Sequence, residues 1–200
     1  MSNSPSRPGR STLQFLRRGV VLLVCVLATA GPTEARAGTE AAVRSASVAL
    51  DQDVYELEAR TSLEIPEDAR KAIEAGLTMR VDYEIELNRD RSYWVDKGIA
   101  SLVQTYELSY HALSQRYLVR NLNTGEQQDY GTFNAAIDRL SEVRGLPVFD
   151  AALVEAGRRY SVSVRVVVDL NSSSEALSWI LFWTDDWSAK SEWYTWPLRP

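Results

Sequence analysis

The stretch Val81-Asp82-Tyr83-Glu84-Ile85-Glu86-Leu87 (residues 81–87) alternates apolar and acidic side chains without a break. Successive side chains of a β-strand point to opposite faces, so this segment predicts a strand with one apolar and one acidic face. Residues 101–110 and 160–170 alternate in the same way. The run 166–168 is apolar on both faces, which favours a central position in a sheet for the third of these strands.

Shorter strand patterns and turn signals surround the three long segments. Four shorter segments have the composition of strands: residues 43–50, 54–63, 116–121 and 126–130. The polar run 51–53 separates the first two, and a turn ending in Gly125 separates the last two. Polar residues such as aspartate favour turns and glycine adopts positive φ readily, so both connections indicate β-hairpins.

Two short helices interrupt the strands. Pro66 and two acidic residues open one helix, which Gly76 is expected to end. Thr132 is the expected cap of a second helix, with apolar residues at helical spacing between 133 and 140. Strands with occasional helices predict a mainly β (α+β) fold. We expect an antiparallel two-layer sandwich or a curved sheet, with two or three short helices at its edges.

The first 37 residues differ from the rest of the chain. Basic residues precede the uncharged run 19–30, and Ala35-Arg36-Ala37 follows it, which is the pattern of a secretory signal peptide. Twelve helical residues span about 18 Å, short of the roughly 30 Å hydrocarbon core, which favours a cleaved signal over a retained anchor. We expect Sec-type export, cleavage near Ala37 and Gly38, and a periplasmic location. A single β-rich domain over 38–200, with no integral membrane span, would remain.

Composition excludes several classes of protein. The chain has 200 residues, of which 45% are hydrophobic and 24% charged, with one cysteine and one histidine. A disordered chain, a disulfide scaffold and a Cys/His metal module are therefore excluded. The formal net charge of −5 argues against binding to nucleic acid.

The sequence offers no recognisable catalytic constellation. His111 follows a predicted strand, and neither Ser109 nor Ser114 lies in a nucleophile elbow. We predict a structural role, in which a ring nitrogen closes a hairpin hydrogen bond. Glu84 and Glu86 are interpreted as solvated. Motifs for phosphate, dinucleotides and metals are missing from the sequence, so we predict no catalytic residue, no cofactor and no metal ligand.

Aromatic residues gather near the C-terminus. Five of the six tryptophans fall after residue 178, and Trp179 and Trp183 share a face of a predicted helix over 176–183. For these two, burial in the core and surface docking both stay open. Residues 191–196 predict a last strand that Pro197 ends, and core packing is favoured for Trp193 and Trp196.

A second aromatic cluster lies at the tip of the hairpin connection 88–98. It contains Arg91, Tyr93 and Trp94. An arginine can stack on either aromatic ring. The tip is interpreted either as a turn with paired charges or as a recognition element.

Three segments resemble a proteobacterial family of exported proteins of unknown function. They are the run 106–119 with its YHALSxxYLV motif, the run 123–126 and the ending 191–198 with its SxWYxWPL motif. The resemblance covers nearly the whole chain after the signal, except for residues between Leu170 and Trp187. It implies a bacterial envelope location and an association with a membrane sensor kinase of a nitrogen-regulation type.

These observations favour a non-enzymatic periplasmic protein–protein interaction module. Its expected partner is an inner-membrane sensor kinase or another envelope protein, and no nucleic acid. The expected docking residues are Trp179, Trp183, Trp94, Tyr93 and Arg91. Two alternatives stay open: a periplasmic carrier of an apolar small molecule or lipid, and a hydrolase that uses His111.

Overall fold

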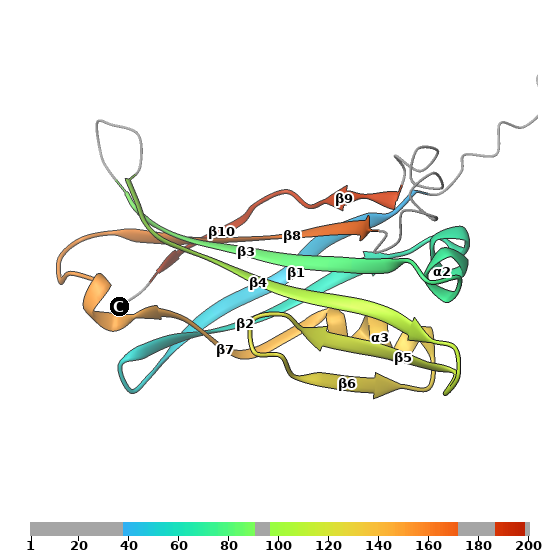
Figure 1. The fold of residues 1–200 in the computed structure, drawn as a ribbon. Coiled ribbons are helices and arrows are strands. Elements are labelled where there is room, and N and C mark those ends of the chain that lie inside the picture. The colour runs from blue at the N-terminus through green and yellow to red at the C-terminus, as the bar shows by residue number, and fades with distance from the viewer. Residues whose placement is uncertain (1–37, 91–96, 172–186, 199–200) are drawn as a thin grey trace, which may run out of the picture. The chain divides into compact units, whose positions relative to one another are not determined.

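The computed structural model describes residues 38–90, 97–171 and 187–198, which form two antiparallel sheets (Figure 1). The smaller sheet has the order β1 (Glu40–Asp51), β2 (Val54–Glu64), β7 (Glu142–Asp150). The larger sheet has the order β10 (Tyr194–Leu198), β8 (Tyr160–Asn171), β3 (Thr78–Arg89), β4 (Lys97–His111), β5 (Arg116–Asn121), β6 (Gln127–Tyr130). The short strand β9 (Ala189–Lys190) also pairs with β8. The predicted fold class, mainly β and antiparallel with short helices, is confirmed.

The core is built from the apolar faces of both sheets. In β3, Val81, Tyr83, Ile85 and Leu87 are completely buried, as their alternation predicts. Strand β8 pairs with β3 on one side and with β9 and β10 on the other, so its predicted central position is confirmed. We call the face of each sheet that points away from this core its outer face.

A buried hydroxyl network ties the two sheets together. The Tyr83 hydroxyl of β3 donates to the carbonyl oxygen of Leu140 at 2.6 Å and lies 3.0 Å from Thr61 Oγ1 of β2. Thr61 uses both its backbone N–H and its hydroxyl to bond the Ser141 carbonyl, at 2.9 and 3.2 Å. One buried tyrosine therefore joins a strand of each sheet to the end of the second helix.

The two predicted helices are present. They are α2 (Glu67–Glu74), which starts after Pro66, and α3 (Phe133–Leu140). Thr132 caps α3, because its side chain accepts the Ala135 N–H at 3.2 Å. Gly76 follows α2 with φ 110°, a conformation that favours glycine. A further 3-10 turn, η1 (Ala151–Leu153), follows β7, and none of the helices in the described ranges is long and apolar enough to cross a membrane.

Two expectations about strands need correction. The sequence signals did not predict β7, because Gly145 and Pro147 interrupt its pattern; Gly145 has φ 57° and lies beside irregularities in the β2–β7 pairing. Pro197 was expected to end the last strand, but it pairs with Ser161 and the strand continues to Leu198. Proline is tolerated there because β10 is an edge strand, whose outward positions need no N–H donor.

The tail tryptophans divide between the core and the outer face. Trp187 is buried in the core, and Trp196 is half-buried and packs against it. Trp193 is half-buried on the opposite face, where the Arg165 guanidinium lies 4.2 Å from the centre of its ring. The core prediction is therefore wrong for Trp193, which comes just before β10 and stacks on Arg165 instead of entering the core.

Two buried tyrosines are expected to make the domain less stable at alkaline pH. Burial raises the pKa of Tyr83 to about 12 from its ordinary value of 10.0. Burial, followed by the hydrogen bond that its hydroxyl donates to Glu74 of α2, raises the pKa of Tyr117 to about 12. Both groups keep their protons in the folded state at a pH where the unfolded chain loses them.

We predict that the free energy of unfolding is constant with respect to these two groups below pH 10 and falls as the pH rises from 10 to 12. Urea denaturation at pH 9 and pH 11 measures the difference. The Tyr117→Phe variant should lose less stability over this interval, since phenylalanine does not titrate. An equal loss in the variant would show that Tyr117 does not contribute.

Candidate interaction surface

The five residues expected to dock a partner lie outside the described part of the chain. Arg91, Tyr93 and Trp94 belong to the range 91–96, and Trp179 and Trp183 belong to 172–186. Their docking role therefore stays a prediction. The structure does describe β4, the strand that follows residues 91–96, and one edge of this strand is unusual.

Among the described residues, no strand pairs with the first part of β4, from Lys97 to Thr105, on the side away from β3. β4 has 15 residues and β5 has six, and β5 pairs only with the half from Tyr106 to His111. The Leu122 N–H donates to the Thr105 carbonyl at 2.9 Å, so the backbone groups of Thr105 point toward the β5 side. Strand geometry then turns the backbone groups of Val103 and Ser101 to the same side, beyond the end of β5.

An asparagine-rich turn ends the pairing at Thr105. The Asn121 side-chain oxygen accepts hydrogen bonds from the Gln104 side chain at 2.7 Å and from the Asn123 N–H at 2.9 Å. Asn123 in turn accepts the Thr105 N–H at 2.8 Å and donates to the Val103 carbonyl at 2.9 Å. This turn replaces two rungs of a strand ladder, and no described strand pairs with the edge from Ala100 to Val103 on this side. We call these four residues the open edge.

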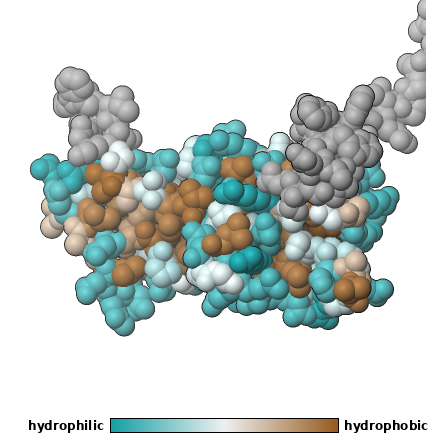
Figure 2. Space-filling view, in the orientation of Figure 1, coloured by the Kyte–Doolittle hydropathy of each residue, from teal (hydrophilic) through white to brown (hydrophobic). Residues whose placement is uncertain are grey.

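Apolar side chains border the open edge on both faces of the sheet. On the outer face, Val103 is 45% exposed and Leu122 of the turn is 43% exposed. On the core face, Ala100 and Leu102 are only half-buried, although Tyr106 and Leu108 further along β4 are buried. Figure 2 shows apolar patches interspersed with polar surface on the face of the molecule that Figure 1 presents.

The chain matches one known family. A domain of unknown function, DUF4390, matches residues 38–197. The chain belongs to the DUF4390 family. This confirms the expected membership of a family of unknown function. The chain matches no curated protein and no solved structure.

The other strand edges of this DUF4390 domain are protected in the residues that the structure describes. Strand β10 carries Pro197, β7 carries Gly145 and Pro147, and β6 has four residues. Strand β1 has a pairing irregularity beside Arg44 and contacts β8, β9 and β10 of the other sheet. Proteins use prolines, bulges, short strands and coverage to stop edges from pairing with other chains. Between Ala100 and Val103 the open edge of β4 has no proline and no covering strand among the described residues, and the pairing irregularity of this strand, at Ile99, comes just before it.

The outer face beside the open edge carries acidic side chains, most of which form ion pairs with arginines. Arg165 Nε donates to Glu84 at 2.6 Å beneath Trp193, and Arg80 Nε lies 3.0 Å from Asp82. Glu84 is therefore held in an ion pair, and its interpretation as simply solvated is wrong. Glu86 differs, since the contact found among the described side chains is the Asn88 amide at 3.4 Å.

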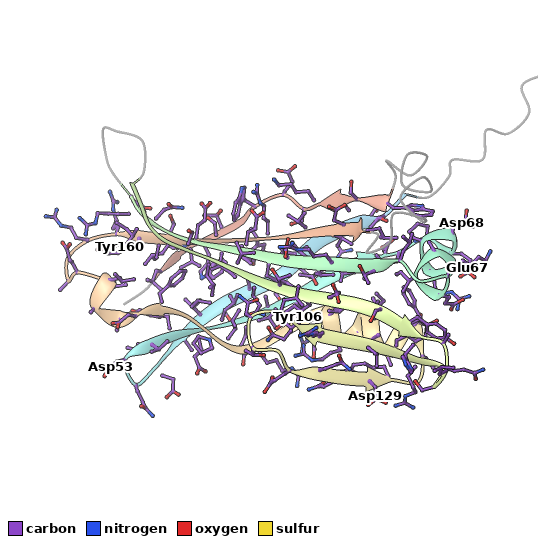
Figure 3. The ribbon with its side chains drawn as sticks, in the orientation of Figure 1. Asp53, Glu67, Asp68, Tyr106, Asp129 and Tyr160 are labelled. Atoms are coloured by element: carbon purple, nitrogen blue, oxygen red, sulfur yellow. The ribbon has the colours of Figure 1, made fainter. Side chains whose placement is uncertain are left out.

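The hairpin tip of the DUF4390 domain has an ordered base. Arg89 donates to Glu155 and to the Tyr160 hydroxyl, the latter at 3.0 Å, and its guanidinium lies over the Tyr160 ring. Tyr160 is labelled in Figure 3. Asp90 accepts from the Ser161 hydroxyl at 3.0 Å. The chain that leads into residues 91–96 is thus fixed to β8, and the chain that leaves them enters the open edge.

His111 has the structural hydrogen bond that the sequence predicts. Its Nδ1 lies 2.8 Å from Ser114 Oγ within the turn between β4 and β5, and both residues are exposed. The Ser114 N–H also approaches the same nitrogen at 3.4 Å. The pair closes the hairpin turn, which is the role expected for it.

A cleft of about 550 Å³ lies over β1, β2 and β7. Its lining includes Ser45, Ser47, Glu58, Arg60 and Glu142. These side chains are polar or charged, so this cleft does not suit the apolar ligand of the carrier alternative.

Proposed function

We propose that this DUF4390 domain is a non-enzymatic protein–protein interaction module of the bacterial envelope. In this proposal the signal at residues 1–37 directs the chain to the periplasm. There it serves as an accessory to a membrane protein, such as an inner-membrane sensor kinase. The hairpin tip with Arg91, Tyr93 and Trp94 contributes to docking.

One observation carries the proposal: the open edge of β4 in a sandwich whose other described edges are protected. The Ser101 and Val103 backbone groups point away from the sheet and are flanked by exposed apolar side chains. An unprotected edge is a liability for a soluble domain unless another polypeptide uses it. Only residues 97–99 separate this edge in sequence from the predicted tip.

The test is photo-crosslinking in living cells that produce the full chain. A photoreactive phenylalanine replaces Val103 in one variant and Arg120 in a control; Arg120 is exposed in β5, whose edge is already paired. We expect position 103 to capture one specific envelope protein that position 120 does not capture. A third variant at Trp94 tests the predicted tip.

Capture of the same proteins from positions 103 and 120 would contradict the proposal, because it would show only abundance and proximity. Failure of position 103 to crosslink in a correctly exported chain would also overturn it. A combined Trp179→Ala and Trp183→Ala chain shows whether the C-terminal tryptophans belong to the same docking surface.

A further inference from the structure

We infer that the open edge binds an extended segment of its partner as an added β-strand, with apolar residues at alternate positions and a lysine or arginine opposite Ser101. This inference rests on the proposed function and specifies the chemistry of the partner. It follows from the backbone groups, the apolar side chains and one acidic side chain at the edge.

The backbone offers three unused hydrogen-bonding groups among the described residues. They are the N–H and the carbonyl of Ser101 and the N–H of Val103, while the Val103 carbonyl already accepts the Asn123 amide. An extended peptide that pairs with Ser101 exchanges two hydrogen bonds with it, as in any antiparallel ladder. Addition of a strand to a sheet edge is a common mode of peptide recognition, in which main-chain bonds supply affinity and side chains supply specificity.

Alternation decides which side chains of the added strand are apolar. The residues opposite Ala100 and Leu102 point to the core side, since both of these side chains pack against the core cluster. Leu146 and Val148 of β7 are likewise half-buried against the same cluster. Apolar partner residues at these alternate positions extend the core across the open edge.

Glu86 supplies the preference for a basic residue. It pairs in register with Ser101 on one side and with Ser163 on the other, so small side chains flank it on the outer face. Asp82 and Glu84 have arginine partners, whereas Glu86 has no cation within ion-pair distance among the described side chains. An added strand lies roughly 10 Å from β3, twice the interstrand spacing. A lysine or arginine opposite Ser101 spans that distance over the serine.

The test uses a phage-displayed library of random octapeptides. The library is selected for binding to the protein purified from the cells that express the full chain. We expect enriched sequences with apolar residues at alternate positions and a lysine or arginine between them. A fluorescein-labelled synthetic copy of the strongest binder then serves as the probe in fluorescence anisotropy. Selected peptides without this alternation would overturn the inference.

Two matched changes in the protein separate backbone pairing from side-chain contact. Ser101→Pro removes the outward N–H and should lower the affinity for the probe at least tenfold. Ser101→Ala keeps the N–H and should change this affinity less than twofold. Pro197 shows that this fold accepts proline on an edge strand. Equal binding by both variants would overturn strand addition.

Changes in the probe leave the protein untouched and so do not depend on the folding of a variant. The backbone nitrogens of the peptide are methylated one at a time. Methylation should weaken binding at least tenfold at every second residue and have little effect at the residues between. Glu86→Gln should lower the affinity for the basic probe several-fold. It should not change the affinity for a second probe in which methionine replaces the basic residue. Effects without a two-residue period, or equal effects of Glu86→Gln on both probes, would contradict the inference.

The two proposals fail in different ways. Specific capture of an envelope protein from position 103, combined with no two-residue period in the N-methyl series, overturns strand addition and supports the interaction module. Loss of both results overturns both proposals.

Discussion

Replacement of Tyr83 with alanine is expected to lower the free energy of unfolding by about 3–5 kcal/mol. The side chain is completely buried and its ring meets Tyr106 edge-on, with 6.3 Å between ring centres. Its hydroxyl also joins the Leu140 carbonyl and the Thr61 hydroxyl. The substitution therefore leaves a large cavity and removes the hydrogen bonds that connect the sheets. Urea denaturation followed by tryptophan fluorescence measures the change.

Tyr83→Phe is the matched control, because it keeps the ring and removes only the hydroxyl. It is expected to cost about 1–3 kcal/mol, the range for a buried carbonyl that loses its partner. A cost near zero would show that the hydroxyl network does not stabilise the contact between the sheets. A cost equal to that of the alanine variant would show that the ring contributes little.

The strands that carry the core could be predicted because their pattern is local. The alternation in residues 81–87 fixes which side chains of β3 face inward, and the doubly apolar run 166–168 indicates a strand paired on both sides. Strand β7 could not be found in this way, since Gly145 and Pro147 are turn signals by every local rule. Its place in the sheet depends on β2, which tolerates the irregular pairing.

The candidate surface depends on pairing between distant segments and was missed for that reason. Alternation shows that residues 101–110 form a strand, but it does not show that a neighbour covers only half of it. The unequal lengths of β4 and β5 were visible as unequal sequence patterns and could have indicated an uncovered edge. The ion pair between Glu84 and Arg165 joins residues 81 positions apart. No local pattern contains such a contact.

The second large effect is expected on partner binding. Val103→Lys places a charge at the last residue of the open edge, and a charged side chain is a device by which natural edge strands avoid pairing with other chains. We expect capture of the partner from cells to fall at least tenfold, measured by chemical crosslinking, affinity purification and quantitative mass spectrometry. The free energy of unfolding should change by about 0.5 kcal/mol or less, because Val103 is 45% exposed.

Leu113→Lys is the control that separates position from charge. Leu113 is 93% exposed in the turn between β4 and β5, so this variant makes the same kind of change, apolar to lysine, away from the open edge. It should leave capture unchanged if the edge itself binds the partner. An equal loss in both variants would mean that the added positive charge acts through the overall electrostatics of an acidic protein. In that case the open edge would have no special part in binding, because charges at two separate positions would change capture equally through the net field that steers encounter.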